Sequence, residues 1–520
     1  MIEHSNTTSS KAGRREWIGL AVIALPCVLY SMDLTVLHLA VPRLTRDLAP
    51  SGVQLLWIID IYGFLVAGSL ITAGTLGDRI GRRKLLLAGA VLFAIASVLA
   101  AFSSSAATLI ATRALLGIAG ATVAPSTLSL IRNMFLDPAE RTRAVSIWIM
   151  SYSLGGAIGP LIGGALLQYF WWGSVFLIAV PVMALVLVLG PSYLPEYRDP
   201  NAGKPDVVSA GLSLAAVLSM IYGLKQIAQD GVSAVALAAI LGGVVIGYAF
   251  VRRQLSLDDP LIDLRLFRVP AFSASLAMYG FTILVLFGGF FFLPQYLQLV
   301  RGLSPLASGV WTLPWALAFI VGSFVTPPLA RRYRPASLMA VGTAVATIGY
   351  AMLARLDASS GFAWFAAATF IFSGGISPVF TLTTDLIIGS APPERAGAAS
   401  ALSETCAEFG GAIGIAVFGS IGVAVYRTLM ADAIPAGVAP DVAEAARATL
   451  GGALAAAEHL RPEAATAMTE SARAAFTRAL QVCAMISAVG SAVLAVFAAV
   501  ALQREKPSVG ASEMVSSTSA

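Results

Sequence analysis

The sequence predicts an all-α membrane protein with fourteen transmembrane helices, and three observations support this. Of its 520 residues, 58% are hydrophobic and only 12% are charged, which is about half the charged share of a typical soluble domain. The apolar residues form long runs near the roughly 20 residues that a spanning helix needs. Most of the 33 Lys and Arg residues lie in alternate segments between these runs. We therefore interpret the net charge of +5 as loop asymmetry and expect no nucleic-acid partner.

Fourteen apolar runs are long enough to cross a bilayer. They cover 17–42, 53–75, 85–102, 108–131, 143–168, 171–189, 207–228, 233–252, 271–300, 305–330, 336–354, 361–389, 396–427 and 474–502. The first run is too long for a cleavable signal peptide, so we expect it to remain as the first span. If the N-terminus is cytoplasmic, the basic loops also fall on the cytoplasmic side. Both termini are therefore predicted to be cytoplasmic.

The spacing of the runs predicts two six-helix bundles separated by two extra helices. The predicted divisions are a cytoplasmic tail (1–16), an N-terminal six-helix bundle (17–190), two extra transmembrane helices (207–252), a C-terminal six-helix bundle (271–502) and a second cytoplasmic tail (503–520). Two six-helix halves are typical of transporters built from parallel repeats. Inside the second half, the polar segment 431–473 is rich in Ala and Glu and is punctuated by prolines. We expect it to form an extracellular helical hairpin, with a disordered loop as the alternative.

Charged residues inside a membrane are costly and usually functional. The candidates for proton coupling or substrate binding are Asp33, Asp60, Asp385, Glu404, Glu408 and Arg113. One arginine can neutralise one carboxylate at most, so Asp33, beyond the middle of its span, is expected to titrate or to meet a cation. Glu404 and Glu408 are one helical turn apart and share a face. For two candidates the alternative is a solvated carboxylate without a role in transport, since Asp60 lies near outer water and Asp385 near the inner surface.

Aromatic side chains near these acids are candidates for a cation site. Tyr30, Trp57, Trp148 and Tyr152 recur at helical spacing with one another or with an acid. Aromatic faces with a nearby carboxylate can hold a quaternary ammonium. Ordinary packing or an interfacial aromatic belt is the alternative. Gln295 and Gln298 are candidates for the opposite wall of the cavity.

A glycine-rich stretch interrupts the fifth apolar run. It reads Gly-Gly-Ala-Ile-Gly-Pro-Leu-Ile-Gly-Gly and contains Gly155, Gly159, Pro160, Gly163 and Gly164. Glycines at every fourth position form a smooth strip that lets another helix approach closely, and the proline loosens the helix. The strip is either a tight helix contact or a pivot between two moving halves.

The loop after the second run carries a more specific pattern. It places Gly74, Asp78, Arg79, Gly81 and Arg82 at fixed offsets and resembles the signature loop of the major facilitator superfamily. The stretches 33–42, 113–121 and 155–164 are similar to the first-, fourth- and fifth-helix motifs of its fourteen-helix drug:proton antiporters. The resemblance implies a major facilitator fold, in which Asp78 and the basic residues form a cytoplasmic latch that stabilises one conformation.

The function expected from these features is proton-coupled efflux of lipophilic organic cations such as quaternary ammonium compounds, dyes and biocides. The sequence contains no phosphate-binding loop and no His/Cys metal cluster, so we expect no cofactor, no metal and no enzymatic activity, with the proton gradient as energy source. A monomer in the bacterial inner membrane is expected. The alternatives are export of an endogenous metabolite, peptide or siderophore, and a membrane ligand sensor.

Overall fold

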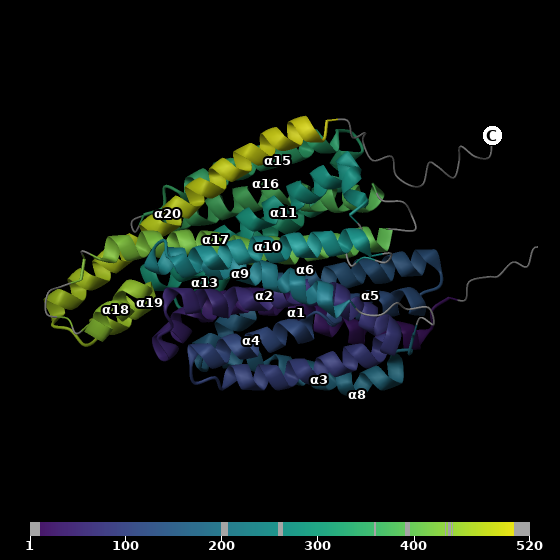
Figure 1. Cartoon of the computed structure of the whole chain (residues 1–520), viewed down its shortest axis with the longest axis horizontal. Coiled ribbons are helices and arrows are strands. Elements are labelled where there is room, and N and C mark those ends of the chain that lie inside the picture. Colours follow the sequence, from purple (N-terminus) through teal and green to yellow (C-terminus); the bar gives the residue numbers. More distant parts are fainter. Residues whose placement is uncertain are drawn as a thin grey trace, which may run out of the picture.

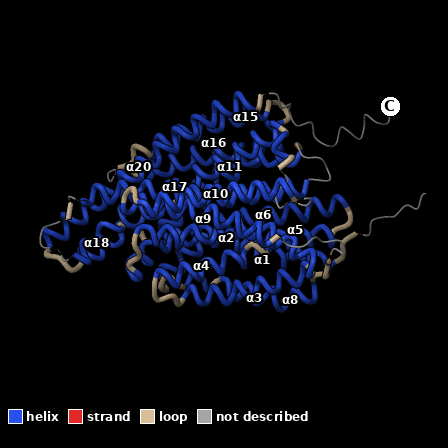
Figure 2. The backbone as a smooth tube through the Cα atoms, viewed as in Figure 1, coloured by secondary structure: helices blue, strands red, loops and turns tan. Residues whose placement is uncertain are grey.

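A computed structural model describes residues 11–198, 206–257, 260, 264–357, 360–390, 396–431, 433–434, 438 and 440–503. These residues form helices joined by loops, and no strand occurs among them (Figure 2). Fourteen helical segments are long and apolar enough to cross a membrane. The predicted number of spans is therefore confirmed. Helices suit this setting because they satisfy their backbone hydrogen bonds internally, where lipid offers no partners.

The N-terminal bundle contains the first six spans. Its helices are α1 (Arg14–Leu48), α2 (Gly52–Ile80), α3 (Arg82–Ala101), α4 (Ala106–Gly120), α5 (Val123–Met134), α6 (Pro138–Tyr169), α7 (Ser174–Leu177) and α8 (Ala179–Tyr193). The fourth span, predicted as one helix, is divided into α4 and α5. Pro125 has no N–H to donate to the carbonyl of Ala121, which accounts for a break at this point.

The C-terminal bundle contains the last six spans. Its elements are the short 3₁₀ helix Leu266–Arg268, α11 (Pro270–Phe290), α12 (Leu293–Gln295), the π-helical turn Tyr296–Val300, α13 (Pro305–Trp311), α14 (Leu313–Ala330), α15 (Pro335–Leu353), α16 (Phe362–Gly389), α17 (Ala396–Ala431) and α20 (Pro462–Ala501). In Figure 1 this bundle occupies the upper half of the view and the N-terminal bundle the lower half.

The two extra helices, α9 (Val207–Asp230) and α10 (Ala234–Ser256), pack side by side. They cross the middle of the view in Figure 1. α9 contacts α2 of one bundle and α17 of the other, whereas α10 exposes a row of large apolar side chains such as Val244 and Leu241. α9 therefore covers the line along which α2 and α17 meet, and α10 packs on α9.

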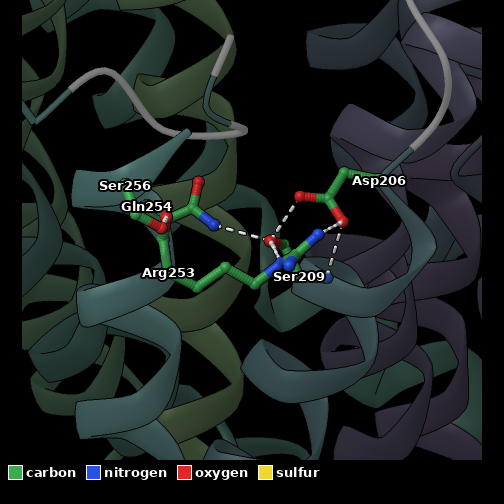
Figure 3. Close-up of polar contacts among 5 residues, drawn as sticks. All are labelled: Asp206, Ser209, Arg253, Gln254 and Ser256. Carbon is green, nitrogen blue, oxygen red and sulfur yellow. Dashed lines mark hydrogen bonds and ion pairs between the residues drawn. The ribbon is translucent and has the colours of Figure 1, made fainter. Parts of the chain in front are cut away.

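A polar clasp joins the two extra helices at one end (Figure 3). Asp206 caps α9 by accepting a hydrogen bond from the Ser209 backbone, and Arg253 of α10 pairs with Asp206 at 3.0 Å. Arg253 and Gln254 also donate to the Ser209 hydroxyl at 3.0 and 2.7 Å. Burial opposes ionisation of Asp206, but the hydrogen bonds from Ser209 and Arg253 lower its pKa below the ordinary value.

Two short helices, α18 (Pro440–Ala448) and α19 (Leu450–Ala457), lie in the polar segment that was expected to be helical. They project at the left of Figure 1, and we call this end of the molecule the hairpin end. α1 begins and α20 ends at the opposite end, which we call the terminal end.

The two bundles touch each other toward the hairpin end. Arg46 pairs with Glu458 at 2.9 Å, and Gln298 donates to the Leu39 carbonyl at 3.1 Å. The Gln298 amide thus contributes to a contact between the bundles, while its place in a cavity wall stays a prediction. Gly52 lies against the backbone of Ala448 in the hairpin segment. These contacts place the closed side of the molecule at the hairpin end.

Candidate functional site

Two neighbouring cavities lie between the bundles. The first, which we call the central cavity, has a volume of about 160 Å³ and is walled mainly by α1, α2, α11 and α17. The second, the aromatic cavity, has a volume of about 370 Å³ and is walled mainly by α6, α11 and α14. Tyr279, Phe287 and Phe380 line both cavities. These three side chains thus lie between neighbouring cavities, to which both bundles contribute.

Arg113 holds Asp33 in a buried ion pair. Its Nη1 atom lies 2.5 Å from Asp33 Oδ2, with the arginine side chain 1% exposed and the aspartate side chain 12% exposed. The Nε atom donates to the Ile58 carbonyl at 3.2 Å, and the guanidinium lies 4.6 Å from the ring centre of Tyr62. A buried pair is tolerated only when such further contacts offset its desolvation. In this conformation the cation that Asp33 meets is therefore Arg113.

Asp60 is paired with a residue that the sequence analysis missed. Lys225 of α9 places its Nζ atom 2.8 Å and 3.0 Å from the two carboxylate oxygens of Asp60, and both side chains are 0% exposed. The same ammonium lies 3.8 Å from the ring centre of Trp57. Trp57 is not among the described residues that line either cavity, so its ring packs against Lys225 rather than facing a ligand there. A charged residue within the predicted span 207–228 was the signal that could have revealed this pair.

The two glutamates of α17 line neighbouring cavities. Glu408 lines the central cavity and accepts a hydrogen bond from the hydroxyl of Tyr30, which belongs to the other bundle. Glu404 lines the aromatic cavity and is exposed. Among the described residues, no basic side chain forms an ion pair with either glutamate. Asp385 is exposed on α16 and is not among the residues that line the two cavities.

Three of the four predicted aromatics gather near these glutamates. Trp148 and Tyr152 line the aromatic cavity, with ring centres 5.0 Å apart in an edge-to-face arrangement. Tyr30 packs on Tyr152 at 5.7 Å. From the other bundle, Tyr279 and Phe380 add rings 5.4 Å apart. An apolar cavity with a few polar groups is typical of a small-molecule site.

The glycine strip of α6 makes two different contacts. A Cβ atom at Gly155 would lie 2.2 Å from the Val28 carbonyl oxygen, and one at Gly159 would lie 2.3 Å from the Thr35 hydroxyl, so this face packs on α1 within its own bundle. Gly163 packs on α1 in the same way. A Cβ atom at Gly164 would instead lie 2.8 Å from the Pro305 carbonyl oxygen of the C-terminal bundle. The strip thus provides both the tight helix contact and a meeting point of the halves.

Pro160 adds to the contact between the halves. Its carbonyl oxygen would lie 2.4 Å from a Cβ atom at Gly309 of α13, so the two backbones approach closely. Both interpretations of the glycine-rich stretch therefore have a structural basis, while its role as a pivot stays a prediction.

The signature loop ties neighbouring helices of the N-terminal bundle together. Asp78 pairs with Arg82 at 2.5 Å, and Arg82 also donates to the Pro125 carbonyl at 3.2 Å. Gly81 has a φ of +115°, a backbone conformation that favours glycine. Arg79 is exposed. A Cβ atom at Gly74 would lie 3.7 Å from the Pro125 side chain, which is an ordinary van der Waals distance. The role of the loop as a conformational latch stays a prediction.

Two helical bundles around cavities that are lined by embedded acids are typical of membrane transporters. A family model described as "Major Facilitator Superfamily" matches residues 23–415, which is most of the chain. The chain belongs to this superfamily and is a multi-pass membrane protein, a transporter rather than an enzyme. The family that the motifs indicated is therefore confirmed.

Similar proteins agree with this assignment. The chain is 42% identical to the multidrug efflux pump LfrA of Mycolicibacterium smegmatis over 96% of this chain and 98% of that one. It is 36% identical to the methyl viologen resistance protein SmvA of Salmonella typhimurium over 89% and 93%. The crystal structure of a bacterial homologue of the human lysosomal transporter Spinster matches with a TM-score of 0.64 at 19% identity, covering 96% and 99%. That likeness supports the fold alone.

Proposed function

We propose that the protein is a multidrug efflux transporter that exports lipophilic organic cations in exchange for protons. The names of its relatives, a multidrug efflux pump and a methyl viologen resistance protein, support a drug substrate, and methyl viologen is itself a dication. The observation that carries the proposal is Glu404, an exposed carboxylate in the wall of an aromatic cavity. Aromatic faces and one carboxylate together select a lipophilic cation, because rings attract the cation and exclude water.

The orientation of the protein in the membrane follows from the loop charges. Basic loops favour the cytoplasm, so the terminal end is the cytoplasmic end and the hairpin end faces outward. The membrane is the bacterial plasma membrane. The contacts between bundles at the hairpin end then correspond to a state that is closed to the outside. In this state a cation reaches Glu404 from the cytoplasmic side.

Exchange with protons requires a carboxylate that binds either a proton or the cation. Glu408 suits this role because its hydrogen bond from Tyr30 joins α17 to α1 across the two bundles. A change in what Glu408 carries alters that contact and therefore the relative stability of the two conformations. Proton entry from outside then favours release of the drug there, and the two flows are linked without direct contact.

The test is uphill transport by purified protein in proteoliposomes. An imposed proton gradient should drive tetraphenylphosphonium accumulation by the wild type. Glu404→Gln should lower the initial rate at least about tenfold, the effect of losing one charge-assisted contact. Glu463→Gln is the matched control, since Glu463 is exposed at the start of α20 and lines neither cavity, and its variant should retain transport. A wild-type protein whose cation uptake ignores the proton gradient would refute the proposed function.

A further inference from the structure

The Lys225–Asp60 pair connects the extra helices to the central cavity, and the function proposed above gives it no role. Asp60 lines this cavity together with His38, Arg113 and Glu408. Lys225 reaches it from α9, which belongs to neither six-helix bundle. A side chain from outside the bundles therefore supplies the counter-charge to a carboxylate inside the candidate site.

Anchoring of α9 does not explain this pair. An apolar cluster already holds the helix, with Ile221 of α9 packed among Phe64 of α2 and Ala412 and Ala416 of α17. Closer to the terminal end, Gly68 of α2 lies directly beneath the Leu214 side chain. Replacing a buried ion pair by apolar residues is often neutral or stabilising, so such a pair is weak support for a purely structural role.

We propose that Lys225 is a specificity-determining residue of the central cavity. Its ammonium acts as a resident cation, that is, a built-in counter-ion that occupies the Asp60 carboxylate. While the ammonium occupies Asp60, that carboxylate is not available to a substrate. Arg113 occupies Asp33 in the same way. Glu408 accepts its hydrogen bond from a neutral hydroxyl and so remains the uncompensated acid of this cavity. The inference rests on the proposed export of cations.

Substrates with one and with two positive charges differ in what they require here. A monocation is neutralised by one glutamate, and Lys225 can stay in place. A dication gains from a second carboxylate, which Asp60 supplies only if the ammonium leaves. The Trp57 ring, 3.8 Å from Nζ, offers the displaced ammonium a cation–π contact. Lys225 therefore disfavours dications relative to monocations, because its ammonium competes with the second charge of a dication for the Asp60 carboxylate.

The experiment compares proton-driven transport of methyl viologen, a dication, with that of tetraphenylphosphonium, a monocation, by full-length protein in proteoliposomes. Lys225→Met keeps the length of the side chain and removes its charge. It should raise the ratio of dication to monocation kcat/KM about tenfold or more, the value of one charge-assisted contact. Lys225→Arg keeps the charge and should leave the ratio near that of the wild type.

Arg253→Gln is the matched control for disturbance of the extra helices. It weakens the clasp at the other end of the same helix pair (Figure 3) without changing the charge at Asp60. Its dication-to-monocation ratio should equal that of the wild type. An equal shift in Arg253→Gln and Lys225→Met would overturn the proposal, because loosening of the helices would then account for both.

A second variant keeps the proposal testable if Lys225→Met does not fold. The double variant Asp60→Asn/Lys225→Met buries no unpaired charge, and it should lower the ratio below the wild-type value because the displaceable carboxylate is gone. An unchanged ratio in either Lys225→Met or the double variant would overturn the inference while wild-type transport continues. Failure of the wild type to couple either cation to protons would instead refute the proposed function.

Discussion

The ion pair between Asp33 and Arg113 leads to a quantitative prediction for Asp33→Asn. Arg113 is 1% exposed and its guanidinium lies 2.5 Å from the carboxylate, so the substitution leaves a buried charge without its counter-ion. Breaking such a pair costs about 3–5 kcal/mol of folding free energy. Arg113 keeps its bond to the Ile58 carbonyl and its contact with Tyr62, which places the cost near the lower end, about 3 kcal/mol. That is more than a hundredfold in the folding equilibrium.

Thermal unfolding in detergent, followed by tryptophan fluorescence, measures this cost. Asp47→Asn is the matched control, since Asp47 is exposed near the end of the same helix, and its Tm should stay at the wild-type value. Asp33→Asn/Arg113→Gln should recover stability, because neither charge then remains buried alone. The reasoning fails if Asp33→Asn unfolds at the temperature of Asp47→Asn.

Transport provides a separate readout of the same variant. We expect Asp33→Asn to reach the membrane, to lose cation efflux and to release no protons when drug is added. Asp33→Glu keeps the charge one methylene further from the backbone and should retain partial function. Uphill cation export by Asp33→Asn under a proton gradient would show that transport does not need the Asp33–Arg113 pair and would leave coupling to Glu408 alone.

Further predictions concern the glycine strip, the signature loop, the second glutamate and the clasp. Gly159→Leu should insert normally but lose efflux, because overpacking costs about 1–3 kcal/mol; near-normal transport would remove the strip from the mechanism. Asp78→Asn should keep drug binding and lower turnover, and unchanged cysteine labelling from both sides would contradict the latch. Glu408→Gln should lose drug-induced proton release; retained release would exclude Glu408 from coupling. Because the pKa of Asp206 is lowered, its stabilisation is complete above the ordinary aspartate pKa, about 4, and lost as pH falls through the folded-state pKa. The Tm of Asp206→Asn, measured over a series of acidic pH values, should therefore vary less with pH than that of the wild type.

The arrangement of charges suggests a division of labour among the embedded acids. Two of them, Asp33 and Asp60, have resident cations supplied by the protein. The glutamates of α17 have none among the described residues. Under the proposed function the glutamates are the acids that exchange protons and drug, and the paired aspartates regulate which cations enter. Testing Glu404 and Lys225 separately distinguishes these two roles.

The sequence by itself determined the number of spans and the family. Both are local properties: a run of about 20 apolar residues is sufficient for a spanning helix wherever it lies, and motif residues such as Asp78 and Gly81 lie close together along the chain. The candidate acids were found in the same way, because a charge within an apolar run is visible without knowledge of its neighbours. Helix breaks were visible only in hindsight, since prolines such as Pro125 can end a helix or merely kink it.

The tertiary structure alone decided which of these residues meet. Tyr30 and Glu408 are 378 positions apart, and their hydrogen bond depends on how two helices from different bundles face each other. Lys225 lies near the end of its predicted span, where a lysine ordinarily extends to the membrane surface. Only the packing of α9 against α2 turns its ammonium toward Asp60. Pairing of buried charges is a property of helix orientation, and a span that is apolar on nearly all sides does not encode that orientation in its pattern.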